Sequence, residues 1–346
     1  MEVIKPKRLQ KGDKVAVVSP SYAEAKTMPN RLQQSFVFLK SLGLEPILMP
    51  HALEQDKDLP YLSASPKDRA ADINQAFADS SIKAIFCTVG GENCNGLLPF
   101  LDYELIKKNP KIFIGFSDVT VLLLAIFQKT GLVTFHGPNL LFTWGSVRNP
   151  SVYSVDSLTT MIFGGKNLTF KPASYYSDIS FEYTDEVLEE FSLNQKGKNW
   201  KFVKKGKAEG KLLGGGMESI QHLRQTDFWP NFKDSILFLE ECDETVALLH
   251  QWLTNLRLSG VFNQIQGLII GKIADKDKVW DDQPQGLGWD QGMFEKMLLA
   301  ATQGYSFPIL TEVDLGHTRP MLTLPIGIQA RINLNGTIEL LERSTV

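Results

Sequence analysis

Ser117 and Asp118 lie between a predicted strand and a predicted helix, at a position that suits a nucleophile. Lys111–Phe116 is a short apolar run that predicts a buried strand, and the apolar run Val119–Phe127 predicts a helix. A strand-to-helix turn pushes the hydroxyl of Ser117 out of the sheet edge, beside backbone N–H groups without intrahelical partners. Those N–H groups can stabilise an oxyanion. The alternative is that Ser117 or Asp118 only caps the helix.

A hydroxyl nucleophile needs a general base within hydrogen-bond reach. The chain contains five histidines, which are His51, His136, His222, His250 and His317. His317 stands in a glycine-flanked turn after an apolar strand pattern, where an imidazole would be exposed and firmly held. His136 also follows a predicted strand, whereas the other three occur in helical or polar loop patterns that favour structural roles. His317 and His136 are the candidate bases, and a structural role is the alternative for either.

A carboxylate must orient the base. The apolar strand pattern Ile236–Leu239 ends in Glu240 and Glu241, so a strand would deliver a carboxylate to a defined position. Successive side chains of a strand point to opposite faces, and only one of the two can therefore face the base. The alternation alone leaves the choice between them open.

The composition is that of a globular chain of about two domains. Its 346 residues are 43% hydrophobic and 22% charged, and the formal net charge is −3. No basic surplus indicates nucleic-acid binding, and no apolar run approaches the ~20 residues that span a bilayer. The N-terminal segment has no apolar signal core, and Cys87, Cys94 and Cys242 have no metal-ligand spacing. We expect a cytoplasmic protein without a metal site that binds neither nucleic acid nor membranes.

The N-terminal part alternates strand and helix patterns. Expected strands are 14–21, 44–49, 83–88 and 111–116, and expected helices are 30–42, 65–78, 102–108 and 119–127. This alternation predicts a parallel, doubly wound sheet, in which ligands bind at the carboxyl ends of the strands. The Gly90-Gly91 turn and Ser117 follow two consecutive strands, so we expect them to be neighbours.

The rest of the chain divides into two parts. Residues 142–210 are rich in Ser, Tyr, Asn and Lys and read as a linker with an elaborated loop region. Later patterns predict strands at 236–239, 266–271 and 309–314, helices at 217–224, 245–258 and 288–303, and a type I′ hairpin at Asn335-Gly336. Gly214–Gly216 lacks a phosphate-loop fingerprint and indicates a close backbone approach. The expected domains are 1–145, 146–209 and 210–346.

Six segments together resemble one family, in order and over nearly the whole chain. They are KGDKVAVVSPS, VGGENCNGLLPFLDYELIKKNPKIFIGFSDVT, TFHGP, LLGGGMESI, ILFLEECDE and GHTRPMLTLPIG. The set resembles the LD-carboxypeptidase family of serine peptidases, and residues 89–120 are most similar to its microcin-immunity branch. The resemblance implies a flavodoxin-like or Rossmann-like α/β domain, a β-rich C-terminal α/β domain, an active site in the cleft between them, and a homodimer.

The resemblance also implies roles for individual residues. The family's nucleophile falls on Ser117, its general base on His317, and the glutamate that orients this base on Glu240. The oxyanion would be received by the backbone N–H groups of Gly91 and Asp118. No metal or organic cofactor is implied.

The implied substrates are of two kinds. One is a murein tetrapeptide, which would release its terminal D-Ala, and the other is a peptidyl- or aminoacyl-nucleotide amide. Arg319 is a candidate partner for a substrate carboxylate, and Trp144 and Trp200 are candidates to stack on a base. Further candidate contacts are Gly90, Glu92 and Gly215. The alternative from another class is a non-catalytic protein that binds a small ligand in the same cleft.

Two departures from the family pattern concern the substrate. The family has an Asn after paired glycines, and this chain has either Met217 after Gly215-Gly216 or Gly216 after Gly214-Gly215 at that place, so a side chain often found near the site is missing. The segment Glu92–Asn95 also differs from the aromatic version found in typical murein tetrapeptide enzymes.

Overall fold

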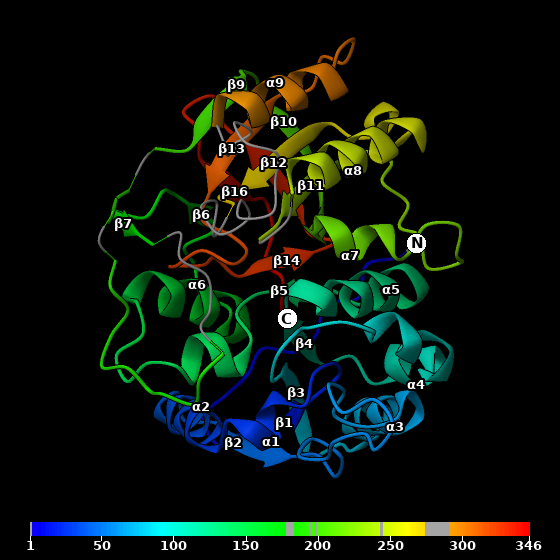
Figure 1. The fold of residues 1–346 in the computed structure, drawn as a ribbon, viewed down its shortest axis with the longest axis vertical. Helices are drawn as coiled ribbons and strands as arrows, with labels where there is room; N and C mark the ends of the chain where they lie inside the picture. The colour runs from blue at the N-terminus through cyan, green and yellow to red at the C-terminus, as the bar shows by residue number, and fades with distance from the viewer. Residues whose placement is uncertain (1, 178–182, 194, 198, 243–244, 274–290) are drawn as a thin grey trace.

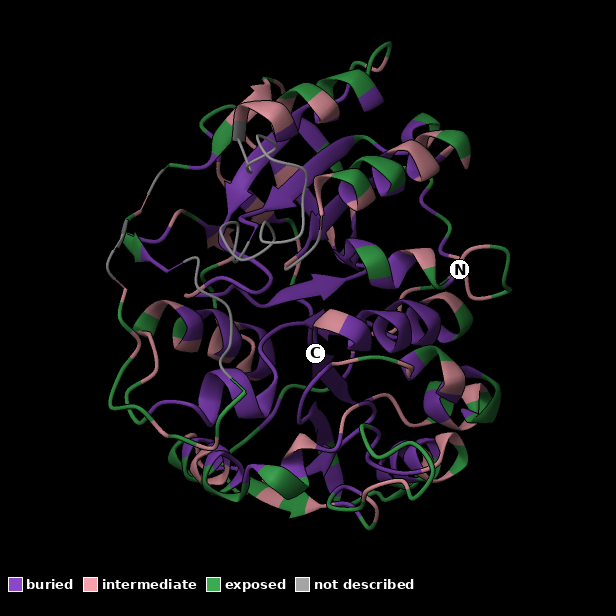
Figure 2. Cartoon of the chain, viewed as in Figure 1, coloured by how far each residue is buried: buried purple, intermediate pink, exposed green. Residues whose placement is uncertain are grey.

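The fold was analysed in a computed structural model. The structure describes residues 2–177, 183–193, 195–197, 199–242, 245–273 and 291–346. Two sheets, each flanked by helices, lie one above the other, and the chain crosses between them more than once (Figure 1). Buried residues are concentrated in the two sheets and in the helix α5 between them (Figure 2).

The first sheet has six strands in the order β14-β5-β4-β3-β1-β2. Its strands are β1 (Lys14–Val18), β2 (Glu45–Leu48), β3 (Ile82–Cys87), β4 (Ile112–Gly115), β5 (Thr134–His136) and β14 (Leu324–Ile326). Strands β1 to β5 are parallel and lie in the flavodoxin-like order 2-1-3-4-5, which confirms the predicted doubly wound sheet. β3 and β4 are paired, so the two turns that follow them are neighbours as expected.

Helices cover both faces of this sheet. They are α1 (Glu24–Thr27), α2 (Pro29–Ser41), α3 (Pro66–Ala78), α4 (Tyr103–Lys108) and α5 (Thr120–Thr130), with the short helical turns η1 (Cys94–Phe100) and η2 (Ser117–Val119). Local sequence explains where α3 and α4 begin, because the side chains of Ser65 and Asp102 accept the N–H groups of Asp68 and Leu105. α5 is apolar all round, which is typical of a fully buried helix.

The second sheet has eight strands in the order β6-β16-β15-β10-β11-β12-β13-β9. They are β6 (Thr169–Phe170), β9 (Lys201–Lys204), β10 (Ala208–Gly216), β11 (Ser235–Glu240), β12 (Gly267–Gly271), β13 (Ile309–Val313), β15 (Gln329–Ile332) and β16 (Ile338–Leu340). The central strands β10 to β13 are parallel and the outer pairs antiparallel. The associated helices are α7 (Met217–Gln221), α8 (Val246–Leu258) and α9 (Gln291–Ala301), with η4 (Val261–Asn263).

The segment expected to be a linker is more ordered than predicted. It contains the twelve-residue helix α6 (Val152–Phe163), preceded by the π-helical turn η3 (Leu140–Trp144), and the two-stranded ribbon of β7 (Tyr175–Tyr176) and β8 (Gln195–Lys196). The sequence of α6 is rich in Val, Ser and Thr, which have low helix propensity, so tertiary packing of Leu158, Met161 and Ile162 decides the outcome.

The predicted C-terminal hairpin is present, but its turn is of another type. β15 and β16 pair antiparallel, and the Gly336 N–H donates to Asn333 O at 2.9 Å. Gly336 has a φ of 79°, whereas Asn335 keeps a negative φ, and a type I′ turn needs both to be positive. The turn is therefore of type I with a glycine bulge, and the prediction of type I′ was wrong.

Candidate active site

Ser117 is held in a strained conformation at the joint between β4 and α5. Its φ is 62°, in the left-handed region that a residue with a Cβ adopts at a cost of about 1–3 kcal/mol. Neighbouring groups hold the turn: Ser219 Oγ donates to the Ser117 carbonyl at 3.2 Å, and the Phe116 N–H donates to Asn139 Oδ1 at 3.2 Å. Such strain is characteristic of a serine presented on a strand-to-helix elbow.

Asp118 does not cap the helix. No side-chain cap hydrogen bond is present at the start of η2 or α5. The buried carboxylate instead accepts the Cys94 N–H at 2.8 Å and the Ser21 hydroxyl at 3.0 Å. Burial raises the pKa of Asp118, and these hydrogen bonds oppose the effect. The capping alternative is therefore wrong, and the carboxylate ties the loops after β1 and β3 to the serine turn.

The Gly90-Gly91 turn lies directly over Ser117. A Cβ atom at Gly90 would lie 2.7 Å from Ser117 Cβ and 3.2 Å from the Asp118 backbone nitrogen. Gly91 has a φ of 118°, and a Cβ there would lie 2.3 Å from the Tyr22 ring. Only glycines allow the backbone to come this close.

Glu240 and His317 form a buried pair. The distance from His317 Nδ1 to Glu240 Oε2 is 2.8 Å, and the two residues are 8% and 1% exposed. Burial acts to raise the pKa of Glu240, but the charge and hydrogen bond of His317 outweigh it and the net shift is downward. Since an ionised carboxylate only accepts, Nδ1 carries a proton, and in the neutral imidazole Nε2 then has the free lone pair. Gly316 makes the approach possible, because a Cβ there would lie 2.3 Å from Glu240 Oε2.

Glu241 has a different role from Glu240. Its carboxylate accepts the backbone N–H of Glu218 at 2.9 Å and that of Cys242 at 3.1 Å. Burial, and then the charge of Glu240, raises the pKa of Glu241 to about 8. The choice that strand alternation left open thus falls on Glu240 as the partner of His317.

His136 is not available as a base. It is the last residue of β5, is fully buried, and packs edge-on against Phe238 at 5.2 Å between ring centroids. Burial lowers the pKa of His136 to about 4.

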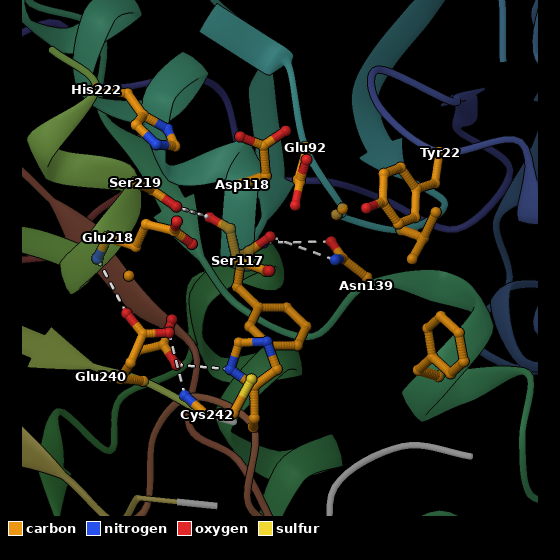
Figure 3. Close-up of a pocket in the computed structure, with 18 of the residues that line it drawn as sticks. Tyr22, Glu92, Ser117, Asp118, Asn139, Glu218, Ser219, His222, Glu240 and Cys242 are labelled. Carbon is orange, nitrogen blue, oxygen red and sulfur yellow. Dashed lines mark hydrogen bonds and ion pairs between the residues drawn. The ribbon is translucent and has the colours of Figure 1, made fainter. Parts of the chain in front are cut away.

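One cavity collects these groups. It encloses about 210 Å³, and Figure 3 shows Ser117 in its wall, with Tyr22 and Glu92 on one side and Glu218 and Ser219 on another. The described residues that line it are Tyr22, Val89, Gly90, Gly91, Glu92, Phe116, Ser117, Asp118, Asn139, Phe142, Tyr183, Gly216, Glu218, Ser219, His222, Glu240, Glu241, Cys242 and His317. They come from both halves of the chain, so the site is interdomain, as the resemblance implied.

Several lining residues were not anticipated from the sequence. His222 lies inside the predicted helix 217–224 and was assigned a structural role, and no site role was predicted for Tyr22, Asn139 and Ser219. Burial, and then the charge of Glu92, raises the pKa of Tyr22 to about 12. A signal that could have found three of them is position in the chain: Tyr22 and Asn139 follow β1 and β5, and Ser219 lies near the start of α7, after Gly214–Gly216.

Four of the predicted contact residues lie elsewhere. Trp144 is buried and stacked on Phe38, with ring centroids 4.2 Å apart. Trp200 is buried and its indole N–H donates to Asp314 Oδ2 at 2.9 Å. These rings fill the core and cannot stack on a substrate in this cavity.

Arg319 and Gly215 are also outside the cavity wall. The Arg319 guanidinium lies over the Phe191 ring at 4.1 Å and lines a separate small cavity. Gly215 allows close contact with Thr120 of α5, since a Cβ there would lie 2.3 Å from Thr120 Cγ2. This is the close backbone approach predicted for Gly214–Gly216.

Within the described residues, no group of three or more His, Cys, Asp or Glu side chains is arranged to hold a metal ion. None of the helices among them is both long enough and apolar enough to cross a membrane.

The elbow serine and the buried histidine–glutamate pair, facing one cavity of an α/β protein, are the parts that a serine-hydrolase centre uses. Two family models match the chain: the LD-carboxypeptidase N-terminal domain over residues 15–137 and the LD-carboxypeptidase C-terminal domain over residues 209–332. The chain belongs to the LD-carboxypeptidase family, as the sequence motifs indicated.

Two curated relatives and one solved structure are similar over most of their lengths. The microcin C7 self-immunity protein MccF of Escherichia coli is 32% identical over 94% of this chain and 91% of its own. A Bacillus subtilis protein named "Probable murein peptide carboxypeptidase" is 31% identical over 95% of this chain and 91% of its own. The solved structure of MccF in complex with glutamyl sulfamoyl guanosine matches with a TM-score of 0.85 and 28% identity, over 99% of each chain.

Proposed function

We propose that the protein is a serine peptidase or amidase that hydrolyses an amide bond through an acyl-enzyme. The observation that supports this most directly is the buried 2.8 Å contact between His317 and Glu240 in the cavity that strained Ser117 lines. A histidine whose Nδ1–H is held by a carboxylate presents Nε2 as a base, which is the arrangement that activates a hydroxyl nucleophile.

In the proposed reaction, Ser117 Oγ attacks the amide carbonyl carbon and His317 Nε2 takes its proton. The backbone N–H groups of Gly91 and Asp118 receive the oxyanion. His317 then gives the proton to the leaving nitrogen as the C–N bond breaks, and water activated by the same imidazole releases the acyl group. Glu240 stays ionised throughout and stabilises the imidazolium.

The proposed substrates are small amides. The name of one relative refers to murein peptides, and another relative, MccF, has been solved with an aminoacyl sulfamoyl nucleoside. We therefore propose that the acyl donor is a murein tetrapeptide or an aminoacyl-nucleotide amide, with both halves of the chain contributing to its site.

Phosphonate labelling and hydrolysis assays test the proposal. Wild-type protein should be labelled on Ser117. It should also cleave one of the two substrates, and mass spectrometry detects the products. Ser117→Ala and His317→Ala should each lower kcat/KM by at least about a thousandfold, and the double variant should be no worse than the singles, because the pair acts as a unit. Ser80→Ala, at an exposed serine, is the matched control.

Additive losses in the double variant would contradict the shared role of Ser117 and His317. Wild-type protein that is neither labelled nor active on either substrate would favour the alternative, a non-catalytic protein that binds a small ligand in this cleft.

A further inference from the structure

The wall of the cavity is strongly acidic. Five of the residues that line it carry carboxyl groups, namely Glu92, Asp118, Glu218, Glu240 and Glu241, of which Glu241, with its pKa raised to about 8, holds a proton near neutral pH. No lysine or arginine is among the described lining residues, and the basic groups there are the imidazoles of His222 and His317. A field of this sign disfavours a substrate with a free carboxylate near Ser117 and favours one with a positive charge.

Three of these carboxylates already have partners in the protein. Glu240 accepts from His317, Asp118 Oδ2 accepts from Cys94 and Ser21, and Glu241 accepts from two backbone N–H groups. The remaining two are Glu92 and Glu218; both residues are exposed, and neither side chain has a hydrogen bond or ion pair within the part of the chain that the structure describes. Of the two, Glu218 is the one whose carboxyl group is partly desolvated.

The backbone of Glu218 is nevertheless firmly placed. Its N–H donates to Glu241 Oε2 at 2.9 Å, and the hydroxyl of the next residue, Ser219, donates to the Ser117 carbonyl at 3.2 Å. Glu218 is therefore anchored between the strand end that carries Glu240 and the turn that carries the serine. Figure 3 shows its side chain extending from α7 toward the side of the cavity that holds Ser117.

A second acceptor lies in the same cavity wall. Asp118 is 3% exposed, and its Oδ1 has no hydrogen-bond partner within the described part of the chain. Partial desolvation, and then the charges of Glu92 and Asp118, raises the pKa of Glu218, while His222 opposes the shift. A cation bound beside Glu218 would relieve this crowding of negative charge.

We propose that Glu218 is a specificity-determining residue that binds a protonated amine on the acyl part of the substrate, close to the carbonyl that Ser117 attacks. This deepens the proposed function and rests on it. The substrate class is then an aminoacyl amide with a free α-amino group, and an N-acylated counterpart or a substrate whose recognition depends on a free carboxylate is a poor one.

The test compares two enzymes on two substrates. We compare kcat/KM of the wild type and of Glu218→Gln on alanyl sulfamoyl adenosine, which has a free amine, and on its N-acetylated counterpart. A murein tetrapeptide is the third substrate. A charge-assisted hydrogen bond is typically worth about 1.5–3 kcal/mol, so Glu218→Gln should lower kcat/KM for the free amine roughly 10- to 100-fold. The value for the N-acetyl compound should stay within about twofold.

Two further variants separate recognition from folding. Glu218→Asp keeps the charge and should retain part of the preference for the free amine, and Glu104→Gln removes an exposed carboxylate on α4 and should leave the preference unchanged. Equal losses on both compounds in Glu218→Gln, or a wild type that prefers the N-acetyl compound or the murein tetrapeptide, would overturn the inference while leaving the hydrolase proposal intact. If none of the three compounds is cleaved and Ser117 is not labelled, the proposed function itself fails.

Discussion

At the scale of single residues, the site depends on a strained backbone conformation and on close approaches that only glycine permits. Ser117 takes a left-handed conformation that its Cβ disfavours, and Gly90 and Gly316 lack a Cβ where one would collide with Ser117 or Glu240. The energetic cost is offset by hydrogen bonds to Ser219 and Asn139 on either side of the serine. Functional placement of the hydroxyl is thus maintained by the surrounding fold.

Glu241 should make stability depend on pH. Its pKa of about 8 lies above the ordinary value of 4.5, so between these values the folded state holds a proton that the unfolded state has lost. The free energy of unfolding contributed by this group is present below pH 4.5 and falls as pH rises toward 8, by up to about 1.4 kcal/mol per pH unit. Urea unfolding at pH 5, 6, 7 and 8 should show a flatter profile for Glu241→Gln than for the wild type.

Glu104→Gln removes an exposed carboxylate and should keep the wild-type profile. Parallel profiles for Glu241→Gln and the wild type would show that Glu241 ionises normally in the folded protein.

At the scale of elements, a buried charge cluster connects the segment before β9 to the turn that carries His317. Lys272 after β12 pairs with Asp314 after β13 and donates to Glu312 O at 2.8 Å. Asp314 Oδ2 also accepts from Trp200 Nε1 and from the Ala173 N–H, each at 2.9 Å. Since His317 follows Asp314 by three residues, this cluster helps to fix where the β13 turn leaves the sheet.

Asp314→Asn should destabilise the protein strongly. It leaves the buried Lys272 ammonium without its counter-charge, and breaking a buried pair in this way typically costs about 3–5 kcal/mol of unfolding free energy. Glu209→Gln, which breaks a surface pair with Arg331, should cost less than about 1 kcal/mol. Urea midpoints measure both.

The double variant Lys272→Met/Asp314→Asn should recover part of the loss, because it removes the stranded charge. A loss in Asp314→Asn no larger than that of Glu209→Gln would show that the cluster does not stabilise the fold.

At the scale of the whole molecule, the two halves are joined by pairing. β14 from the C-terminal part completes the first sheet through antiparallel pairing with β5. The C-terminus also returns to the N-terminal segment, where the Arg8 N–H donates to Val346 O at 2.9 Å and Lys5 contacts Glu342 at 2.6 Å. The expected domain of residues 1–145 is therefore completed by an edge strand and a terminal contact from the C-terminal part of the chain.

Residues 1–145 expressed alone should not fold to a stable monomer. Without β14 the edge of β5 and the apolar surface of α5 that faces β10 would be exposed. Thermal melting followed by circular dichroism should show no cooperative transition for the fragment and a single one for the full chain. A cooperative melt of a monomeric fragment would contradict this expectation.

The homodimer implied by the family resemblance stays a prediction, and light scattering of the full chain tests it.

Much of the fold was determined by local patterns in the sequence. Alternating strands and helices predicted four of the five parallel strands of the first sheet, because each crossover needs a helix and two of the helices, α3 and α4, begin at readable caps, Ser65 and Asp102. Glycines before Ser117 and around His317 marked the turns that carry the site. α6 escaped prediction because its residues have low helix propensity and its stability comes from packing.

The sequence by itself determined the residue types of the candidate site and the elements that deliver them, since nucleophile, base and carboxylate each follow a recognisable strand. Local patterns left the choice within each set open, and the family resemblance named Glu240 and His317. The tertiary structure then decided which side chains meet: Glu240 rather than Glu241 contacts His317, His136 is buried in the core, and carboxyl groups gather around Ser117. It also placed Trp144 and Trp200 in the core. The physical reason is that contact between residues about 80 to 200 positions apart depends on sheet register and burial, which no local pattern encodes.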